Sequence, residues 1–115
     1  MSPIVQSYLR THRRNWCLTQ REVAFLLGGQ AGGQVSRYER LARTPTLEAA
    51  LCCQVLFGPA PHELFPGVFA EVERSIIERA LALHRELDCG DPRPTLQRKL
   101  ELLQAIAVRG ERPLA

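Results

Sequence analysis

Two features that the sequence lacks limit the classes of protein it can encode. No uninterrupted apolar stretch approaches the roughly 18 residues that a membrane-spanning helix requires. The first ten residues, MSPIVQSYLR, lack the apolar centre of a signal peptide. We therefore expect a soluble, cytoplasmic protein.

The four cysteines lack the arrangement of a disulfide framework. Two of the four cysteines, Cys52 and Cys53, are neighbours on one expected helix and point in different directions. Two histidine–cysteine pairs share a five-residue spacing, which is not the spacing of structural zinc ligands. We expect the cysteines to act as small apolar residues, with no metal site.

Signs of catalysis are also missing. We find no set of nucleophile, base and orienting residue, and the glycine-rich segment 28–33, GGQAGG, lacks the Lys-Ser/Thr of a phosphate-binding loop. Its spacing does not fit a dinucleotide fingerprint either. We expect no enzyme activity and no cofactor.

The 115 residues, 45% hydrophobic and 23% charged, fit a globular protein with one main domain. Its charge is unevenly distributed. Seven arginines stand against two glutamates through residue 45, whereas eight basic residues stand against ten acidic ones in the remainder. A basic first half indicates a polyanionic partner, most simply nucleic acid. The alternative is a solvated arginine-rich face.

Every segment between glycine and proline breakers has helical periodicity, so we expect an all-α protein. A first helix should begin at Ser2-Pro3 and end near Asn15. The capping box Thr19–Glu22 should open a second helix that runs to about Leu27. Residues 28–33 read as a turn, and a third helix should cover 33–41.

Thr46 should cap a fourth helix that Gly58-Pro59 ends, and residues 61–65 should form one short turn of helix. We expect Tyr8 and Trp16 in the core rather than stacked on nucleic acid. The apolar positions of the fourth helix should face the same core: Leu47, Ala50, Leu51, Val55 and Leu56.

Two further helices are expected at 68–89 and 95–109, which gives domains at 1–67 and 68–115. Each carries an apolar seam of three- and four-residue spacing. The seams comprise Phe69, Val72, Ile76, Ala80, Leu83 and Leu87, and Leu96, Leu100, Leu103 and Ala107. They can pack on the first domain or form a dimer interface, and we favour a homodimer.

The segment Leu18–Gly28, followed by Val35-Ser36-Arg37-Tyr38-Glu39 and by Thr44–Leu47, resembles the helix-turn-helix of the Xre family, the Cro and phage-repressor-like DNA-binding domains. The resemblance covers residues 4 to 66. It implies a five-helix repressor-like domain, followed here by two C-terminal amphipathic helices. Small Ala24 at the helix crossing and apolar Val35 suit a module that places one helix end in the major groove.

The resemblance also implies roles for single residues. Gln34 and Arg37 lie at positions similar to the family's base-reading ones. Arg13 and Glu39 correspond to an ion pair that joins the first helix to the third. The residues expected to contact the DNA backbone are Gln20, Gly32, Gly33, Ser36, Tyr38, Arg40 and Arg43.

The turn departs from the family pattern. Gly28 and Val35 are seven positions apart, one more than usual, and Gly32 and Gly33 stand where many relatives have polar base-reading side chains. Direct readout of bases by side chains should therefore be reduced. The two glycines would, however, allow backbone amides to approach a DNA phosphate. We expect a DNA-binding transcriptional regulator. The alternative is an antitoxin or interaction adaptor that binds a protein partner through its C-terminal helices.

Overall fold

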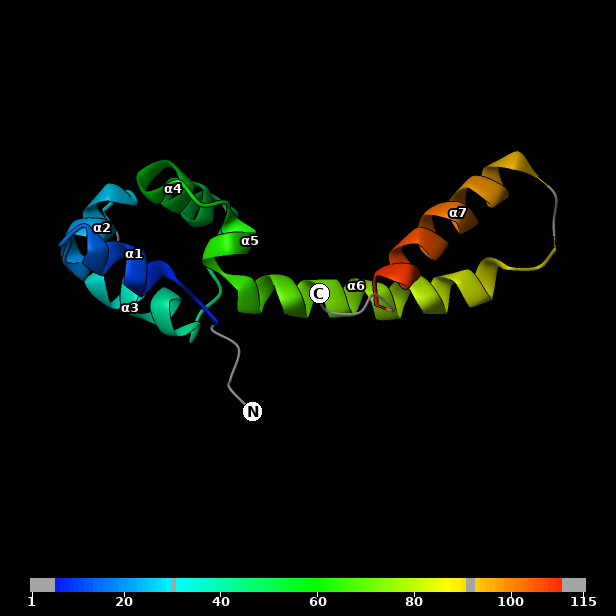
Figure 1. Cartoon of the computed structure of the whole chain (residues 1–115), viewed down its shortest axis with the longest axis horizontal. Helices are drawn as coiled ribbons and strands as arrows, with labels where there is room; N and C mark the ends of the chain where they lie inside the picture. Colours follow the sequence, from blue (N-terminus) through cyan, green and yellow to red (C-terminus); the bar gives the residue numbers. More distant parts are fainter. Residues whose placement is uncertain (1–5, 30, 91–92, 111–115) are drawn as a thin grey trace. The chain divides into compact units, whose positions relative to one another are not determined.

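The structure, a computed structural model, describes residues 6–29, 31–90 and 93–110. Within these ranges the chain forms seven helices and no strand (Figure 1). The expected all-α class is confirmed for this part of the chain. The chain divides into two compact units, Met1–Phe69 and Ala70–Ala115.

The first helix, α1, covers Leu9–Asn15 and is shorter than expected. The expected start at Ser2-Pro3 lies outside the described residues, but residues 6–8 are not helical. The Tyr8 N–H donates to the Leu64 carbonyl at 2.7 Å, and the Ser7 hydroxyl accepts from the Leu9 N–H at 3.3 Å. These bonds give the backbone before α1 partners outside a helix, which is why the helix begins only at Leu9.

Helix α2 covers Gln20–Leu26 and starts with the expected capping box. The Thr19 hydroxyl accepts from the Glu22 N–H at 3.0 Å, and the Glu22 carboxylate accepts from the Thr19 N–H at 2.9 Å. Gly28 and Gly29 follow at φ angles of 109° and 83°. These left-handed conformations end α2 at little cost only because both residues are glycines.

Three short elements complete the first unit. Helix α3 covers Gly32–Arg40 and ends at Leu41, which has a left-handed φ of 52°. Helix α4 covers Leu47–Phe57, with the Thr46 hydroxyl accepting from the Ala49 N–H at 3.1 Å. Helix α5 covers Pro61–Leu64.

The core of the first unit collects side chains from all five helices. The largest fully buried ones are Tyr38, Leu9, Leu64, Val23, Val35 and Cys53. Three predictions about the core were wrong. Trp16 is 67% exposed and Tyr8 is 39% exposed, and α4 presents Ala49, Ala50 and Cys53 to the core rather than most of its expected leucines and valine.

The second unit is a pair of helices. Helix α6, Pro66–Leu87, begins before the division between the units, and α7 covers Pro94–Arg109. Arg109 Nη2 lies 2.5 Å from a carboxylate oxygen of Glu73, and the Gly110 backbone lies against Ile77. The end of α7 therefore returns beside α6, and the two helices are antiparallel (Figure 1).

The contact between α6 and α7 uses only part of the expected α6 seam. Ala80 on α6 and Leu96 and Ala107 on α7 are buried. Val72, Ile76 and Leu83, which we expected in the same seam as Ala80, are 53%, 44% and 43% exposed. In the part of the chain that the structure describes, no helix is long and apolar enough to cross a membrane.

Candidate nucleic-acid interface

Glu39 on α3 connects three helices through its carboxylate. Arg13 Nε on α1 donates to one oxygen at 2.5 Å, and Gln20 Nε2 on α2 donates to the other at 2.9 Å. Only 3% of the Glu39 side chain is exposed. Buried charge-assisted bonds of this kind fix the relative orientation of the helices that they join.

Arg13 also stabilises the connection between α1 and α2. Its Nη1 donates to the Leu18 carbonyl at 2.9 Å, next to Cys17, which has a left-handed φ of 58°. The ion pair expected between Arg13 and Glu39 is thus present, and the arginine is only 11% exposed. This burial removes Arg13 from the surface that a ligand can contact.

The outer face of α3 carries most of the residues expected to contact DNA. Gly33, Arg37 and Arg40 are exposed, and Gln34 and Ser36 are half-buried. Arg40 Nε donates to the Ser36 hydroxyl at 3.4 Å, and Arg37 Nη1 lies 3.5 Å from Gln34 Oε1. These weak contacts leave both guanidinium groups available to a partner. Arg43 is exposed in the loop that follows the helix.

Tyr38 does not fit the phosphate contact expected from the sequence. Its side chain is in the core, with 1% of the residue exposed, and its hydroxyl accepts a hydrogen bond from Gln34 Nε2 at 3.1 Å. The residue instead anchors the inner face of α3. Through Gln34 it also holds one of the two expected base-reading side chains in a defined orientation.

The beginning of α3 lies against the beginning of α2. A Cβ added at Gly32 would be 3.7 Å from the Arg21 backbone, which is ordinary contact. Ala31, the N-cap of α3, makes no side-chain cap. Gln20, the first residue of α2, is half-buried, and its amide nitrogen has a second hydrogen besides the one given to Glu39.

The described residues offer no group of three or more His, Cys, Asp or Glu side chains that could hold a metal ion. Burial, together with the neighbouring Cys52 thiol, raises the pKa of Cys53 to about 11. Its thiol therefore stays protonated near neutral pH and serves as a core residue.

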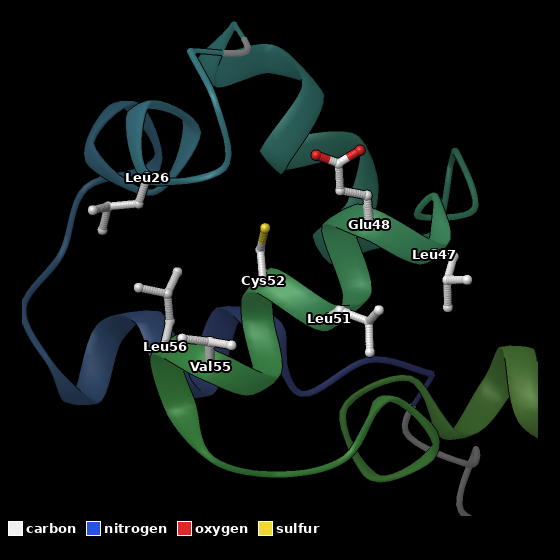
Figure 2. Close-up of a pocket in the computed structure, with 7 residues that line it drawn as sticks. All are labelled: Leu26, Leu47, Glu48, Leu51, Cys52, Val55 and Leu56. Carbon is white, nitrogen blue, oxygen red and sulfur yellow. The ribbon is translucent and has the colours of Figure 1, made fainter.

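Sequence reasoning missed an apolar groove between α2 and α4. Its lining includes Leu26 from α2 and Leu47, Leu51 and Val55 from α4 (Figure 2). The signal available in the sequence was that α4, LEAALCCQVLF, is apolar on nearly all sides. A helix of that composition buries one face and still presents apolar side chains on another.

Comparisons with protein-family models, with curated proteins and with solved structures found no match for the chain.

Proposed function

We propose that the protein is a sequence-specific DNA-binding transcriptional regulator, in which α2 and α3 form a helix-turn-helix of the Xre type. The observation that carries this proposal is the arrangement around α3. Its inner face is fixed to α1 and α2 through Glu39, and its outer face exposes Arg37 and Arg40. A rigidly held helix with a basic, solvent-facing side suits insertion into the major groove.

The roles proposed for single residues follow from the resemblance, and the exposure of Arg37, Arg40 and Arg43 supports those of the arginines. Gln34 and Arg37 read base edges, since glutamine can bond adenine and arginine can bond guanine in a bidentate manner. Arg40 and Arg43 contact phosphates, as do Ser36 and the free hydrogen of the Gln20 amide. The start of α3, at Gly32 and Gly33, presents backbone amides to a phosphate, because its N-cap residue Ala31 makes no side-chain hydrogen bond to them.

A homodimer that reads a palindromic operator completes the proposal. The two-helix second unit leaves Val72, Ile76 and Leu83 exposed at spacings of four and seven residues, which places them on one side of α6. A matching stripe on a second copy would cover them. To read a palindromic operator, such a dimer needs its two α3 helices about 34 Å apart, in successive major grooves.

The test is a selection of bound fragments from random DNA, followed by titrations at several salt concentrations. We expect one sequence to be enriched, and its affinity to fall steeply as salt is added, because phosphate contacts release counterions. Failure to enrich any sequence at low salt would contradict the proposal.

The exposed apolar surfaces favour a second candidate, an antitoxin or adaptor that binds a protein through the C-terminal helices. This candidate uses the exposed stripe of Val72, Ile76 and Leu83 for a foreign protein. Indifference to DNA at every salt concentration in the same titrations would favour the adaptor.

A further inference from the structure

One of the two proposed base-reading side chains is hydrogen-bonded to a residue of the core. Gln34 is half-buried near the start of α3, and its Nε2 donates to the Tyr38 hydroxyl at 3.1 Å. Tyr38 is among the most deeply buried residues of the first unit, with 1% of the residue exposed. Its phenol oxygen, one helical turn along from Gln34, is therefore a fixed point that holds the amide.

A third residue defines which way round the amide lies. Arg37 Nη1 lies 3.5 Å from Gln34 Oε1. A guanidinium can only donate hydrogen bonds, so it favours the amide oxygen on its own side. The amide nitrogen consequently faces the Tyr38 hydroxyl, whose oxygen accepts from it. Without these contacts the amide would turn freely, because the terminal torsion of a glutamine is broad and roughly two-fold.

We propose that Tyr38 is a positioning residue for base readout, whose hydroxyl acts through Gln34 to set a preference for adenine over guanine at one position of the bound sequence. This inference rests on the proposed function and adds to it the residue that determines the choice of base. Tyr38 itself stays in the core and contacts no DNA.

The preference for adenine follows from the hydrogen bonds that the Gln34 amide still has to offer. Its nitrogen carries two hydrogens, and one of them is given to Tyr38. One hydrogen and the carbonyl oxygen remain for DNA. In the major groove, adenine presents an acceptor at N7 and a donor at N6, which match this remaining pair. The amide oxygen has two lone pairs, so it can accept from adenine while Arg37 stays beside it.

Guanine does not match the same amide. Its edge in the major groove carries two acceptors, N7 and O6. An amide held by Tyr38 has one hydrogen for these two acceptors, and its oxygen would face the other one. Without the hydroxyl, the amide could turn its nitrogen toward the groove and donate both hydrogens to guanine. The hydroxyl therefore acts against the wrong base as well as for the right one.

Selections from random DNA with wild type, Gln34→Ala and Tyr38→Phe test the inference. The Gln34→Ala selection identifies the position that Gln34 reads, because the base preference is lost there. Wild type should prefer adenine at that position. Tyr38→Phe keeps the buried ring and removes only the hydroxyl. It should lower the ratio of adenine to guanine affinity at that position by about 2- to 10-fold, the effect expected of one hydrogen bond.

A purely structural role of the hydroxyl would not change this ratio. A loss of stability lowers the folded fraction, and so it weakens binding to both duplexes in the same proportion. Tyr8→Phe, which removes the hydroxyl of the chain's other tyrosine, is the matched control and should leave the ratio unchanged. Circular dichroism verifies that both variants are folded. At positions where Gln34→Ala keeps the base preference, Tyr38→Phe should keep it too.

A measurement on wild type without DNA tests the hydrogen bond itself. In NMR spectra, the side-chain amide hydrogens of Gln34 should exchange with water more slowly than those of Gln104, which is exposed on α7. Equal exchange of the two glutamines would overturn the inference, because Tyr38 would then not hold the amide.

Failure of the inference can be distinguished from failure of the proposed function. An unchanged ratio in a folded Tyr38→Phe protein would show that the hydroxyl does not set the choice of base. A wild-type preference for another base at the Gln34 position, or a Gln34→Ala selection identical to that of wild type, would also overturn the inference. In each case a sequence is enriched and the proposed function stands. If wild type enriches no sequence, the proposed function fails and this inference fails with it.

Discussion

Arg13 and Glu39 form an ion pair at 2.5 Å in which 11% of the arginine side chain and 3% of the glutamate side chain are exposed. Twenty-six residues separate them in the sequence, so the pair fixes α3 against α1. The third partner, Gln20, extends the same contact to α2. The surface proposed to meet DNA therefore depends on a network that lies beneath it.

Removal of one partner from this network should be strongly destabilising. Glu39→Ala leaves the Arg13 guanidinium buried without its counter-charge, and we expect a loss of about 3 kcal/mol in the free energy of unfolding. The measurement is urea denaturation followed by circular dichroism. The double variant Arg13→Met with Glu39→Met removes both charges and should lose less than Glu39→Ala. An equal or greater loss in the double variant would contradict this account.

The start of α3 offers a stabilising substitution. Ala31 has an extended backbone, with ψ at 145°, but no side chain that can accept from the helix amides. Ala31→Ser should supply that cap and raise the free energy of unfolding by about 1 kcal/mol. Thr46→Ala, which removes the existing cap of α4, should lower it by a similar amount. Thermal melts of the two variants should therefore shift in opposite directions.

The capping box of α2 predicts a dependence on pH. The Thr19 backbone N–H, and then the Thr19 hydroxyl, lower the pKa of Glu22 from its ordinary value of 4.5. A lowered folded-state pKa contributes stability that is present above pH 4.5 and is lost as pH falls through the folded-state value. Glu22→Gln should thus be less stable than wild type near neutral pH, and the difference should shrink in acid.

Thermal melts over a pH series check this expectation. Glu101→Gln, at an exposed position on α7, is the matched control. If the wild-type and Glu22→Gln melting curves stay equally far apart at all pH values, the charge of Glu22 is not what stabilises the start of α2.

Some of the structural features behind these predictions could be predicted from the sequence, and others could not. Local polar signals were reliable: the Thr19–Glu22 capping box and the Thr46 cap are where their spacing predicts. A capping bond joins residues three positions apart, so its partners are visible in the sequence. The start of α1 was predicted too early, because the Tyr8 N–H bonds to the Leu64 carbonyl rather than within a helix. These residues are far apart in the sequence, so no local pattern predicts their contact.

The orientation of α4 was also predicted wrongly. Periodicity identifies a buried face only when the opposite face is polar, and α4 has few polar residues to set the phase. We assigned Leu47 and Val55 to the core, whereas the small side chains of Ala49 and Cys53 allow closer packing there. In the candidate site, Arg37 is exposed, as its position on the helix relative to Val35 predicted. The burial of Tyr38 was not predicted, because it depends on tertiary packing that has no local signal in the sequence.

The homodimer is tested on α6. Leu83 is 43% exposed in the protomer, so Leu83→Glu should leave the protomer folded. In the proposed dimer the same substitution would bury a charge, and light scattering should show monomer. Leu81 is 40% exposed and lies two residues away, on the other side of the helix, so Leu81→Glu is a matched control that should stay dimeric. A Leu83→Glu variant that stays dimeric would place the interface elsewhere.

The last prediction separates the arginine that specifies sequence from one that only attracts DNA. Arg37 lies on the exposed face of α3, and its guanidinium is beside Gln34 Oε1. Arg43 lies in the loop beyond that helix. Arg37→Ala should therefore cost roughly 1 to 3 kcal/mol on the preferred operator and relax discrimination at one base pair in each half-site.

Arg43→Ala should instead weaken binding to all sequences about equally and reduce the salt slope by about one per binding unit, because a phosphate contact carries no sequence information. The measurement is a set of binding titrations on the operator and on scrambled DNA, at several salt concentrations, for each variant. Equal losses on both DNAs for Arg37→Ala would mean that the guanidinium meets a phosphate. The long connection from Gly28 to Val35 would then tilt α3 so that a different face of the helix meets the bases.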